Sequence, residues 1–179
     1  MYNAVYASSP VGPLTLAADD THITGLWMEG QKYFGSTLSG PPVRKADHPV
    51  LQKACQWLDR YFAGERPGIS ELPLAPSGSE FRREVWRILC DIPYGEVMTY
   101  GEISKRIAAE MGRKSMSAQA VGGAVGHNPI SILIPCHRVV GSDGSLTGYA
   151  GGLVRKRRLL ELEGVNLSRL FVPSVGTAL

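Results

Sequence analysis

Short apolar runs separated by turn-forming residues fill the first thirty positions of the chain. The runs lie at residues 3–7, 14–18 and 23–28, and they are rich in residue types that strands favour. Proline and glycine at 9–13 mark a turn between the first two runs. This pattern predicts a small antiparallel sheet, and the Gly-, Ser- and Pro-rich stretch 35–44 is expected to be a loop.

Apolar residues recur at every third or fourth position from residue 48 onward, which is the period of a helix. We expect helices over 48–62, from about 80 to the residue before Ile92, over 100–111 and over 118–126. Ser77-Gly78-Ser79-Glu80 and Thr99-Tyr100-Gly101-Glu102 match the capping-box pattern, and Ser117 is an expected N-cap. The proline-rich segment 67–79 predicts a linker between two halves.

The change of period predicts an α/β (α+β) fold in two parts. Residues 1–76 are expected to form a small antiparallel-sheet domain, and 77–165 a helical domain, with a tail at 166–179. Two short helices joined by a polar turn within 100–126 fit a helix-turn-helix of winged-helix type. Shape alone is weak evidence, because most helix pairs of this kind are simply packed helices.

Composition excludes several classes of protein. Hydrophobic residues make up 44% and charged residues 20% of the chain, which is typical of a globular protein. No run approaches the ~20 apolar residues needed to cross a bilayer, so no membrane contact is expected. The N-terminus carries no basic region followed by an apolar one, which favours the cytoplasm, or the nucleus in a eukaryote.

Charge is distributed unevenly along the chain. The net charge is +3, with 6 basic and 7 acidic side chains in residues 1–79 against 12 and 9 in residues 80–165. This balance weakly favours contact between the second half and a nucleic acid, and an ordinary fluctuation of surface charge explains it equally well.

The three cysteines, Cys55, Cys90 and Cys136, are too few and too scattered for a disulfide framework. Cys136 follows an apolar run and Pro135, and it precedes His137. A buried thiol needs a nearby base or positive charge to react, and His137 and Arg138 are the nearest candidates. The alternative is that Cys136 is an inert core thiol.

Adjacent side chains of a regular strand point to opposite faces, so a direct bond between Cys136 and His137 requires a turn or a bridging water. A carboxylate that orients the imidazole would come from Glu161 or Glu163. No metal site is expected, because the chain has no Cys-x-x-Cys and no histidine pair at helical spacing.

Several ordered blocks of sequence resemble one known family. They are Pro135-Cys136-His137-Arg138-Val139, Gly126-His127-Asn128-Pro129 and Gly148-Tyr149-Ala150-Gly151-Gly152, together with blocks at 92–101 and 159–163. Over about residues 81–164 the chain resembles the O6-alkylguanine-DNA alkyltransferases, and the first half resembles their variable N-terminal domain more weakly.

The resemblance implies DNA repair by irreversible transfer of an alkyl group to Cys136, with O6 of guanine as the main donor position and O4 of thymine as a second candidate. Each molecule would act once, with no cofactor. The implied partner is double-stranded DNA containing alkylated guanine, bound through the minor groove with little sequence specificity by a monomer. The target nucleotide would be flipped out of the duplex.

Roles for individual residues also follow from the resemblance. His137 would act through a water as the base for Cys136, Glu163 would orient His137, and Asn128 would brace the turn before the cysteine. The base pocket would include Tyr100, Val139, Tyr149, Ala150, Gly151 and Lys156. The DNA surface would include Ala118, Gln119, Gly122, Gly123 and Arg138.

The chain departs from the family pattern at three points. Gln119 occupies a position where an arginine commonly fills the space left by the flipped base, so Arg113 or Lys114 would have to compensate. Ala150 occupies a position often held by serine. The zinc site of some eukaryotic N-terminal domains is absent.

Two other functions remain open from the sequence. An alkyltransferase-like protein would bind the lesion with weak or no transfer, although such proteins lack the acceptor cysteine. A transcription regulator would use the same helix-turn-helix, although 179 residues leave no room for a further regulator domain. A cysteine hydrolase is a more distant alternative.

Overall fold

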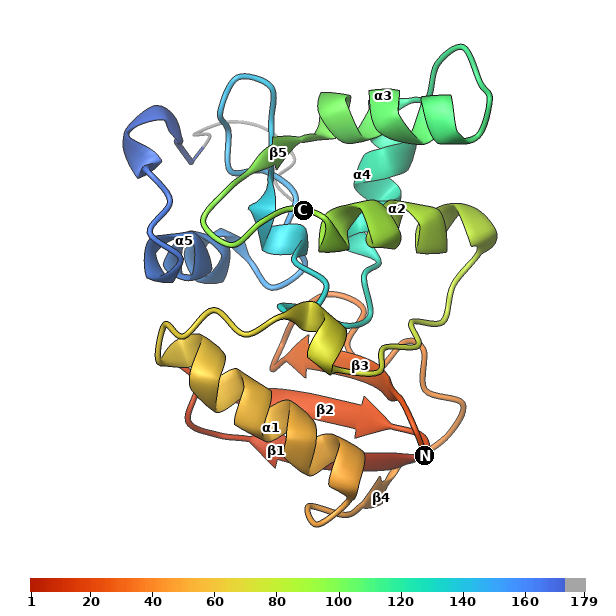
Figure 1. The fold of residues 1–179 in the computed structure, drawn as a ribbon, viewed down its shortest axis with the longest axis vertical. Coiled ribbons are helices and arrows are strands. Elements are labelled where there is room, and N and C mark those ends of the chain that lie inside the picture. The colour runs from red at the N-terminus through yellow and green to blue at the C-terminus, as the bar shows by residue number, and fades with distance from the viewer. Residues whose placement is uncertain (173–179) are drawn as a thin grey trace.

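A four-stranded sheet forms the N-terminal half, with strand order β3-β2-β1-β4 (Figure 1). In the computed structural model, which describes residues 1–172, the strands are β1 (Tyr2–Tyr6), β2 (Leu14–Ala18), β3 (Ile23–Met28) and β4 (Val43–Arg44). The three long strands are antiparallel, as predicted, and β4 runs parallel to β1. The expectation that all of 35–44 is loop is therefore wrong at its end, because the free backbone edge of β1 pairs with β4.

Helix α1 (Pro49–Phe62) covers one face of this sheet and begins with a proline, which suits the first helical turn (Figure 1). Its buried residues follow the predicted spacing of three and four: Leu51, Ala54, Trp57, Leu58 and Tyr61. The predicted linker 67–79 is not a free connection. It contains the short 3₁₀ helix η1 (Ile69–Glu71), and its Pro73 carbonyl accepts a hydrogen bond from Ile23 of β3.

Four helices build the C-terminal half: α2 (Glu80–Cys90), α3 (Tyr100–Glu110), α4 (Ala118–Gly126) and α5 (Leu153–Leu162). The capping box at Thr99 and the N-cap at Ser117 are confirmed. The capping box at Ser77 is wrong, because Ser79 is the N-cap and accepts from Arg82 N. Helices α2, α3 and α4 pack together, and Trp86 Nε1 donates to Ala124 O at 2.8 Å. Strands β5 (Met98–Thr99) and β6 (Val139–Val140) pair in parallel.

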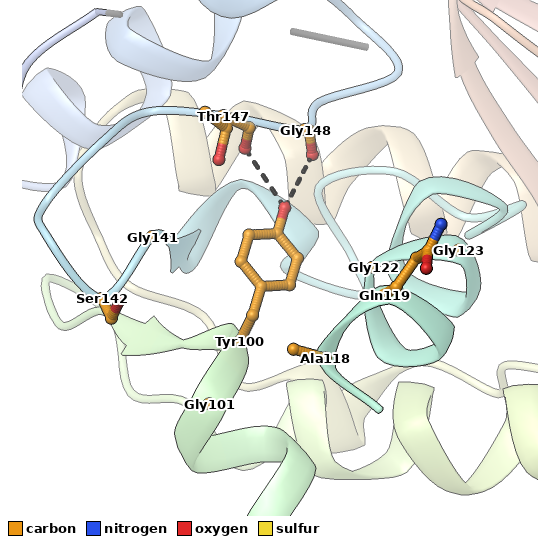
Figure 2. A pocket seen from close by; sticks show the side chains of 10 residues that line it. All are labelled: Tyr100, Gly101, Ala118, Gln119, Gly122, Gly123, Gly141, Ser142, Thr147 and Gly148. Carbon is orange, nitrogen blue, oxygen red and sulfur yellow. Dashed lines mark hydrogen bonds between the residues drawn. The ribbon is translucent and has the colours of Figure 1, made fainter. Parts of the chain in front are cut away.

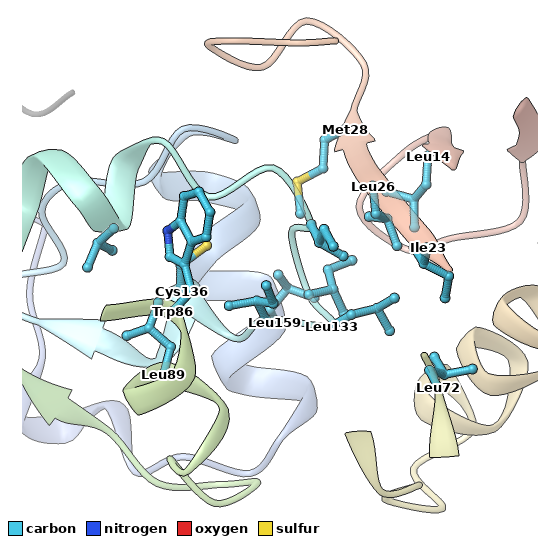
Figure 3. Close-up of a cluster of buried hydrophobic side chains, with 14 of the residues drawn as sticks. Leu14, Ile23, Leu26, Met28, Leu72, Trp86, Leu89, Leu133, Cys136 and Leu159 are labelled. Carbon is cyan, nitrogen blue, oxygen red and sulfur yellow. The ribbon is translucent and has the colours of Figure 1, made fainter. Parts of the chain in front are cut away.

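One hydrophobic core joins the two halves. Leu26 of β3 donates to Pro129 O and accepts from Ser131 N, both at 2.9 Å, so the segment before Cys136 is bound to the edge of the sheet. The apolar run 130–134 forms a tight turn, with Ile132 at φ 70°. Figure 3 shows side chains of β3 near Leu133, and Cys136 close to Trp86. The N-terminal sheet therefore helps to place the cysteine segment.

The predicted tail 166–179 is described as far as residue 172. It forms the 3₁₀ helix η3 (Leu167–Arg169), after which Phe171 exchanges backbone hydrogen bonds with Gly144 and Leu146. Residues 173–179 lie outside the described part of the chain. Among the described residues no helix is long and apolar enough to cross a membrane.

Candidate functional site

Asn128 braces the turn between α4 and the cysteine segment. Its Oδ1 accepts from Ile130 N at 3.0 Å, and its Nδ2 donates to Ile134 O at 2.8 Å. The same Nδ2 lies 3.1 Å from Cys136 Sγ. One amide thus holds two backbone groups of the turn and offers a hydrogen-bond donor to the sulfur.

Cys136 begins the 3₁₀ helix η2 (Cys136–Arg138), so Cys136 and His137 do not lie on a regular strand. Cys136 is 4% exposed. Burial raises the pKa of Cys136, while the Asn128 amide and the positive charge of Lys156 oppose that rise. The resting sulfur is therefore a thiol, surrounded by groups that stabilise a thiolate once a proton leaves.

His137 and Glu163 form a fully buried pair, with His137 Nε2 2.7 Å from Glu163 Oε1. Burial lowers the pKa of His137 more than Glu163 raises it, so the imidazole is neutral near pH 7. Burial alone would raise the pKa of Glu163, but hydrogen bonds from His137 and then Arg138 hold it well below its usual value. The ionised carboxylate has no proton to give, so Nε2 carries the hydrogen and Nδ1 is the free acceptor.

Arg138 is buried against Glu163 and does not face solvent. Its Nε lies 2.8 Å from Glu163 Oε2, its Nη2 3.0 Å from Oε1, and its Nη1 2.6 Å from Ile92 O. The assignment of Arg138 to the DNA surface is therefore corrected: every nitrogen of its guanidinium is used inside the protein.

Lys156 is also fully buried, and its Nζ donates to Thr147 O at 2.7 Å. Burial lowers its pKa to about 8, although the neighbouring Cys136 opposes that shift. A positive charge on this lysine, beside the sulfur, favours the thiolate.

A cavity of about 720 Å³ opens beside Tyr100 (Figure 2). It is lined by Tyr100, Gly101, Ala118, Gln119, Gly122, Gly123, Gly141, Ser142, Thr147 and Gly148. The four predicted DNA-contacting residues of α4 therefore share one wall, where Gly122 and Gly123 carry no side chain. Tyr100 Oη donates to Thr147 O and Gly148 O, each at 3.1 Å.

The other predicted pocket residues are not among those that line this cavity. Val139 and Tyr149 are buried, and Tyr149 Oη lies 3.8 Å from Met28 Sδ. Ala150 lines a smaller cavity of about 80 Å³, and its carbonyl accepts from Lys32 N at 3.0 Å. Gly151 packs so closely that a Cβ there would lie 2.6 Å from Met28 Sδ, which explains the glycine.

The structure adds one group that the sequence analysis missed. Tyr61 Oη of α1 donates to Glu163 Oε1 at 2.6 Å in the buried interior. The only signal for Tyr61 in the sequence is its helical spacing. That spacing predicts a buried ring but gives no hydrogen-bond partner for the hydroxyl. No cluster of three or more His, Cys, Asp or Glu suited to a metal ion occurs within residues 1–172.

Comparisons with known proteins agree on both halves of the chain. The profile of the 6-O-methylguanine DNA methyltransferase DNA-binding domain matches residues 80–165, and that of the 6-O-methylguanine DNA methyltransferase ribonuclease-like domain matches residues 1–76.

Similar proteins cover nearly the whole chain. A methylated-DNA--protein-cysteine methyltransferase of Haemophilus influenzae is 45% identical over 161 residues, covering 89% of this chain and 85% of its own. One of Methanosarcina acetivorans is 42% identical over 165 residues, covering 92% and 99%. The crystal structure of Mycobacterium tuberculosis OGT in complex with DNA superposes with a TM-score of 0.78 at 42% identity, covering 97% of this chain and 96% of that one. The predicted fold class is confirmed. The chain belongs to the 6-O-methylguanine DNA methyltransferase family, and it is a DNA-binding enzyme of direct-reversal repair that transfers a methyl group to a protein cysteine.

Proposed function

We propose that this chain removes the alkyl group from O6-alkylguanine in duplex DNA and that Cys136 Sγ is the acceptor. One observation carries the proposal: the buried sulfur lies 3.1 Å from an amide donor and next in sequence to a buried His–Glu pair. Cys55 and Cys90 are free thiols in helices, and no hydrogen bond of either side chain occurs among the described residues. Cys136 is therefore the cysteine equipped for nucleophilic chemistry.

The transfer begins with loss of the Cys136 proton. His137 Nδ1 is buried and has no hydrogen-bond partner within residues 1–172, so it is an acceptor suited to a proton relayed through one water. The developing thiolate is stabilised by the Asn128 amide and the Lys156 charge.

The thiolate then attacks the alkyl carbon. A carbon–sulfur bond forms, the carbon–O6 bond breaks, and the electron pair of that bond passes to O6 and the purine ring, which takes up a proton to give guanine. The product is a thioether. No group at the site can return the sulfur to a thiol, so each molecule reacts once.

The substrate must open a path to the sulfur. Cys136 is buried and is not on the lining of the cavity beside Tyr100. Tyr100, Thr147 and Gly148 all line this cavity, and the Tyr100 hydroxyl is bonded to the carbonyls of the other two (Figure 2). We expect entry of the flipped base to separate residues 147–148 from Tyr100, whose hydroxyl is then free to donate a hydrogen bond to the base.

The proposed DNA contact is the α4 wall of the cavity. Apart from Gln119, the residues of this wall are small, namely Ala118, Gly122 and Gly123. Small residues suit a shallow approach to the minor groove better than long side chains that read base edges. Gln119 can hydrogen-bond the orphaned cytosine but brings no charge. One copy of the chain holds all the groups named here, which favours a monomer as the acting species.

The test is the mass of the protein after reaction with duplex DNA that carries O6-methylguanine. We expect the mass of one CH2 to be added to the peptide that contains Cys136, with at most one equivalent transferred. Cys136→Ser is expected to abolish transfer. Cys55→Ser and Cys90→Ser are matched controls, because each removes one thiol and should leave transfer intact.

Unmodified Cys136 after mixing, modification of Cys55 or Cys90 instead, or turnover beyond one equivalent would each contradict the proposal.

A further inference from the structure

Five hydrogen-bond donors surround the carboxylate of Glu163. Tyr61 Oη, His137 Nε2 and Arg138 Nη2 lie 2.6, 2.7 and 3.0 Å from Oε1. Arg138 Nε and Gly95 N lie 2.8 and 3.2 Å from Oε2. An ionised carboxylate offers about four lone-pair positions, so this one is saturated. Removal of one donor changes the strength of the hydrogen bonds made by the others, because three of the donors share Oε1.

Tyr61 differs from the other donors in its origin. It lies in the last turn of α1, in the N-terminal half, 102 residues from Glu163 along the chain. Its ring stacks on Trp57 with centroids 5.3 Å apart and meets Tyr94 edge-on at 5.9 Å. The ring is 1% exposed. Packing therefore leaves the hydroxyl no choice of partner.

We propose that Tyr61 is a positioning residue for the transfer reaction: its hydroxyl donates to Glu163 and thereby sets the proton affinity of His137. The proposal rests on the function proposed above, since it assumes that His137 accepts the Cys136 proton. It also gives the N-terminal half a direct part in the chemistry of the C-terminal half.

The physical argument concerns competition for one oxygen. A donor to Oε1 spreads the negative charge of Glu163 and weakens its attraction for the Nε2 hydrogen of His137. Burial, and then the charge of Glu163, hold the pKa of Tyr61 well above its ordinary value, so this phenol stays protonated and donates throughout the working pH range. Loss of the hydroxyl leaves more charge facing His137, which raises the pKa of the imidazole.

Other charged and titratable groups face this network from every element around it. Arg138 and Lys156 lower the pKa of His137, and Glu163 raises it. The other titratable or charged neighbours are Cys136, Tyr94, Tyr149, Cys90, Arg66, Asp91 and Arg155. All of them stay in place when only the Tyr61 hydroxyl is removed, so the change in pH dependence is assigned to that one group.

The test compares Tyr61→Phe with Tyr94→Phe in single-turnover reactions from about pH 5 to 9. Tyr94 is the matched control: its hydroxyl donates to Leu162 O at 3.2 Å, and its ring touches that of Tyr61. For Tyr61→Phe we expect the acid limb to move up by roughly half a pH unit, which lowers the rate on that limb about threefold. Free O6-benzylguanine and alkylated duplex DNA should lose rate equally, because Tyr61 is not among the residues that line the cavity beside α4.

A second substitution reverses the sign. Fluorotyrosine at position 61 keeps the ring and the hydroxyl but is a stronger donor, so the acid limb should move down. If Tyr61→Phe does not fold, the fluorotyrosine variant alone tests the role of the Tyr61 hydroxyl. An acid limb that Tyr61→Phe and fluorotyrosine both leave at its wild-type position, or a rate change that Tyr94→Phe reproduces, overturns the proposal.

Titration of His137 by NMR separates this proposal from the proposed function. A raised imidazole pKa in Tyr61→Phe, measured without any substrate, supports the coupling through Glu163 even if wild-type protein transfers no alkyl group. An unshifted imidazole pKa together with normal wild-type transfer rejects the role of Tyr61 and leaves the proposed function standing.

Discussion

Replacement of Arg138 by methionine removes the guanidinium that joins Glu163 to the end of α2. The methylene stem keeps most of the packing volume, and three hydrogen bonds to Glu163 and Ile92 O are lost. A DNA-contacting arginine and a buried structural arginine predict opposite results for this change, so the substitution tests the placement directly.

The expected cost follows from the burial of the pair. Removing one partner of a buried ion pair costs about 3–5 kcal/mol, because the other charge remains buried. Tyr61 and His137 still donate to Glu163, so the lower end of that range applies. For a chain of 179 residues, a loss of about 3 kcal/mol lowers Tm by roughly 6–12 °C.

The assay is thermal unfolding together with DNA binding at several salt concentrations. Arg157→Met is the matched control, because the Arg157 side chain is 58% exposed and pairs with Glu161 at the surface. Its cost should stay within about 0.5 kcal/mol. An unchanged Tm for Arg138→Met, with weaker DNA binding and a salt slope reduced by about one, would refute the buried role and restore the contact with DNA.

Three further predictions concern neighbouring positions. Gln119→Arg should speed repair of alkylated duplex roughly threefold to tenfold while leaving reaction with free O6-benzylguanine unchanged, and equal effects on both substrates would count against a role for Gln119 on DNA. Asn128→Ala should lower the free energy of unfolding in urea by about 2–4 kcal/mol, because Ile130 N and Ile134 O lose their buried partner, and a cost within about 0.5 kcal/mol would contradict the bracing role. Glu163 has a folded-state pKa below its unfolded value of 4.5, so its stabilising contribution is complete above about pH 4.5 and is lost as the pH falls. Glu163→Gln should therefore be less stable than wild type by about 3 kcal/mol at pH 7, with a difference in urea unfolding that narrows below about pH 4.5, and a constant difference would argue against this linkage.

Local patterns predict most of the secondary structure and the neighbourhood of the cysteine. Asn128, Cys136 and His137 lie within ten positions, so the order of residues places them together before any long-range contact is known. Strand β4 is missed because two residues on a sheet edge leave no periodic pattern.

The burial of Arg138 and the hydrogen bond of Tyr61 were not predicted, for a different reason. Arginine side chains are usually exposed. Arg138 can be buried because Glu163 and the Ile92 carbonyl accept its hydrogen bonds. The helical period of α1 correctly buries Tyr61, but the partner of its hydroxyl lies 102 residues away. The burial of Arg138 depends on packing within the C-terminal half, and the partner of Tyr61 depends on how the two halves pack. Hydrophobic periodicity specifies neither arrangement.

The same packing separates the reactive cysteine from the other two. Burial raises the pKa of all three thiols, that of Cys90 to about 11, so resting acidity does not single out Cys136. Cys136 alone has an amide donor on its sulfur and a lysine charge beside it among the described contacts of these thiols. These groups act on the anion, and the anion forms only when a base takes the proton. A buried, protonated thiol is a poor nucleophile toward small molecules in solution. Cys136 is therefore expected to react only when a flipped nucleobase occupies the pocket, which suits a protein that can react only once.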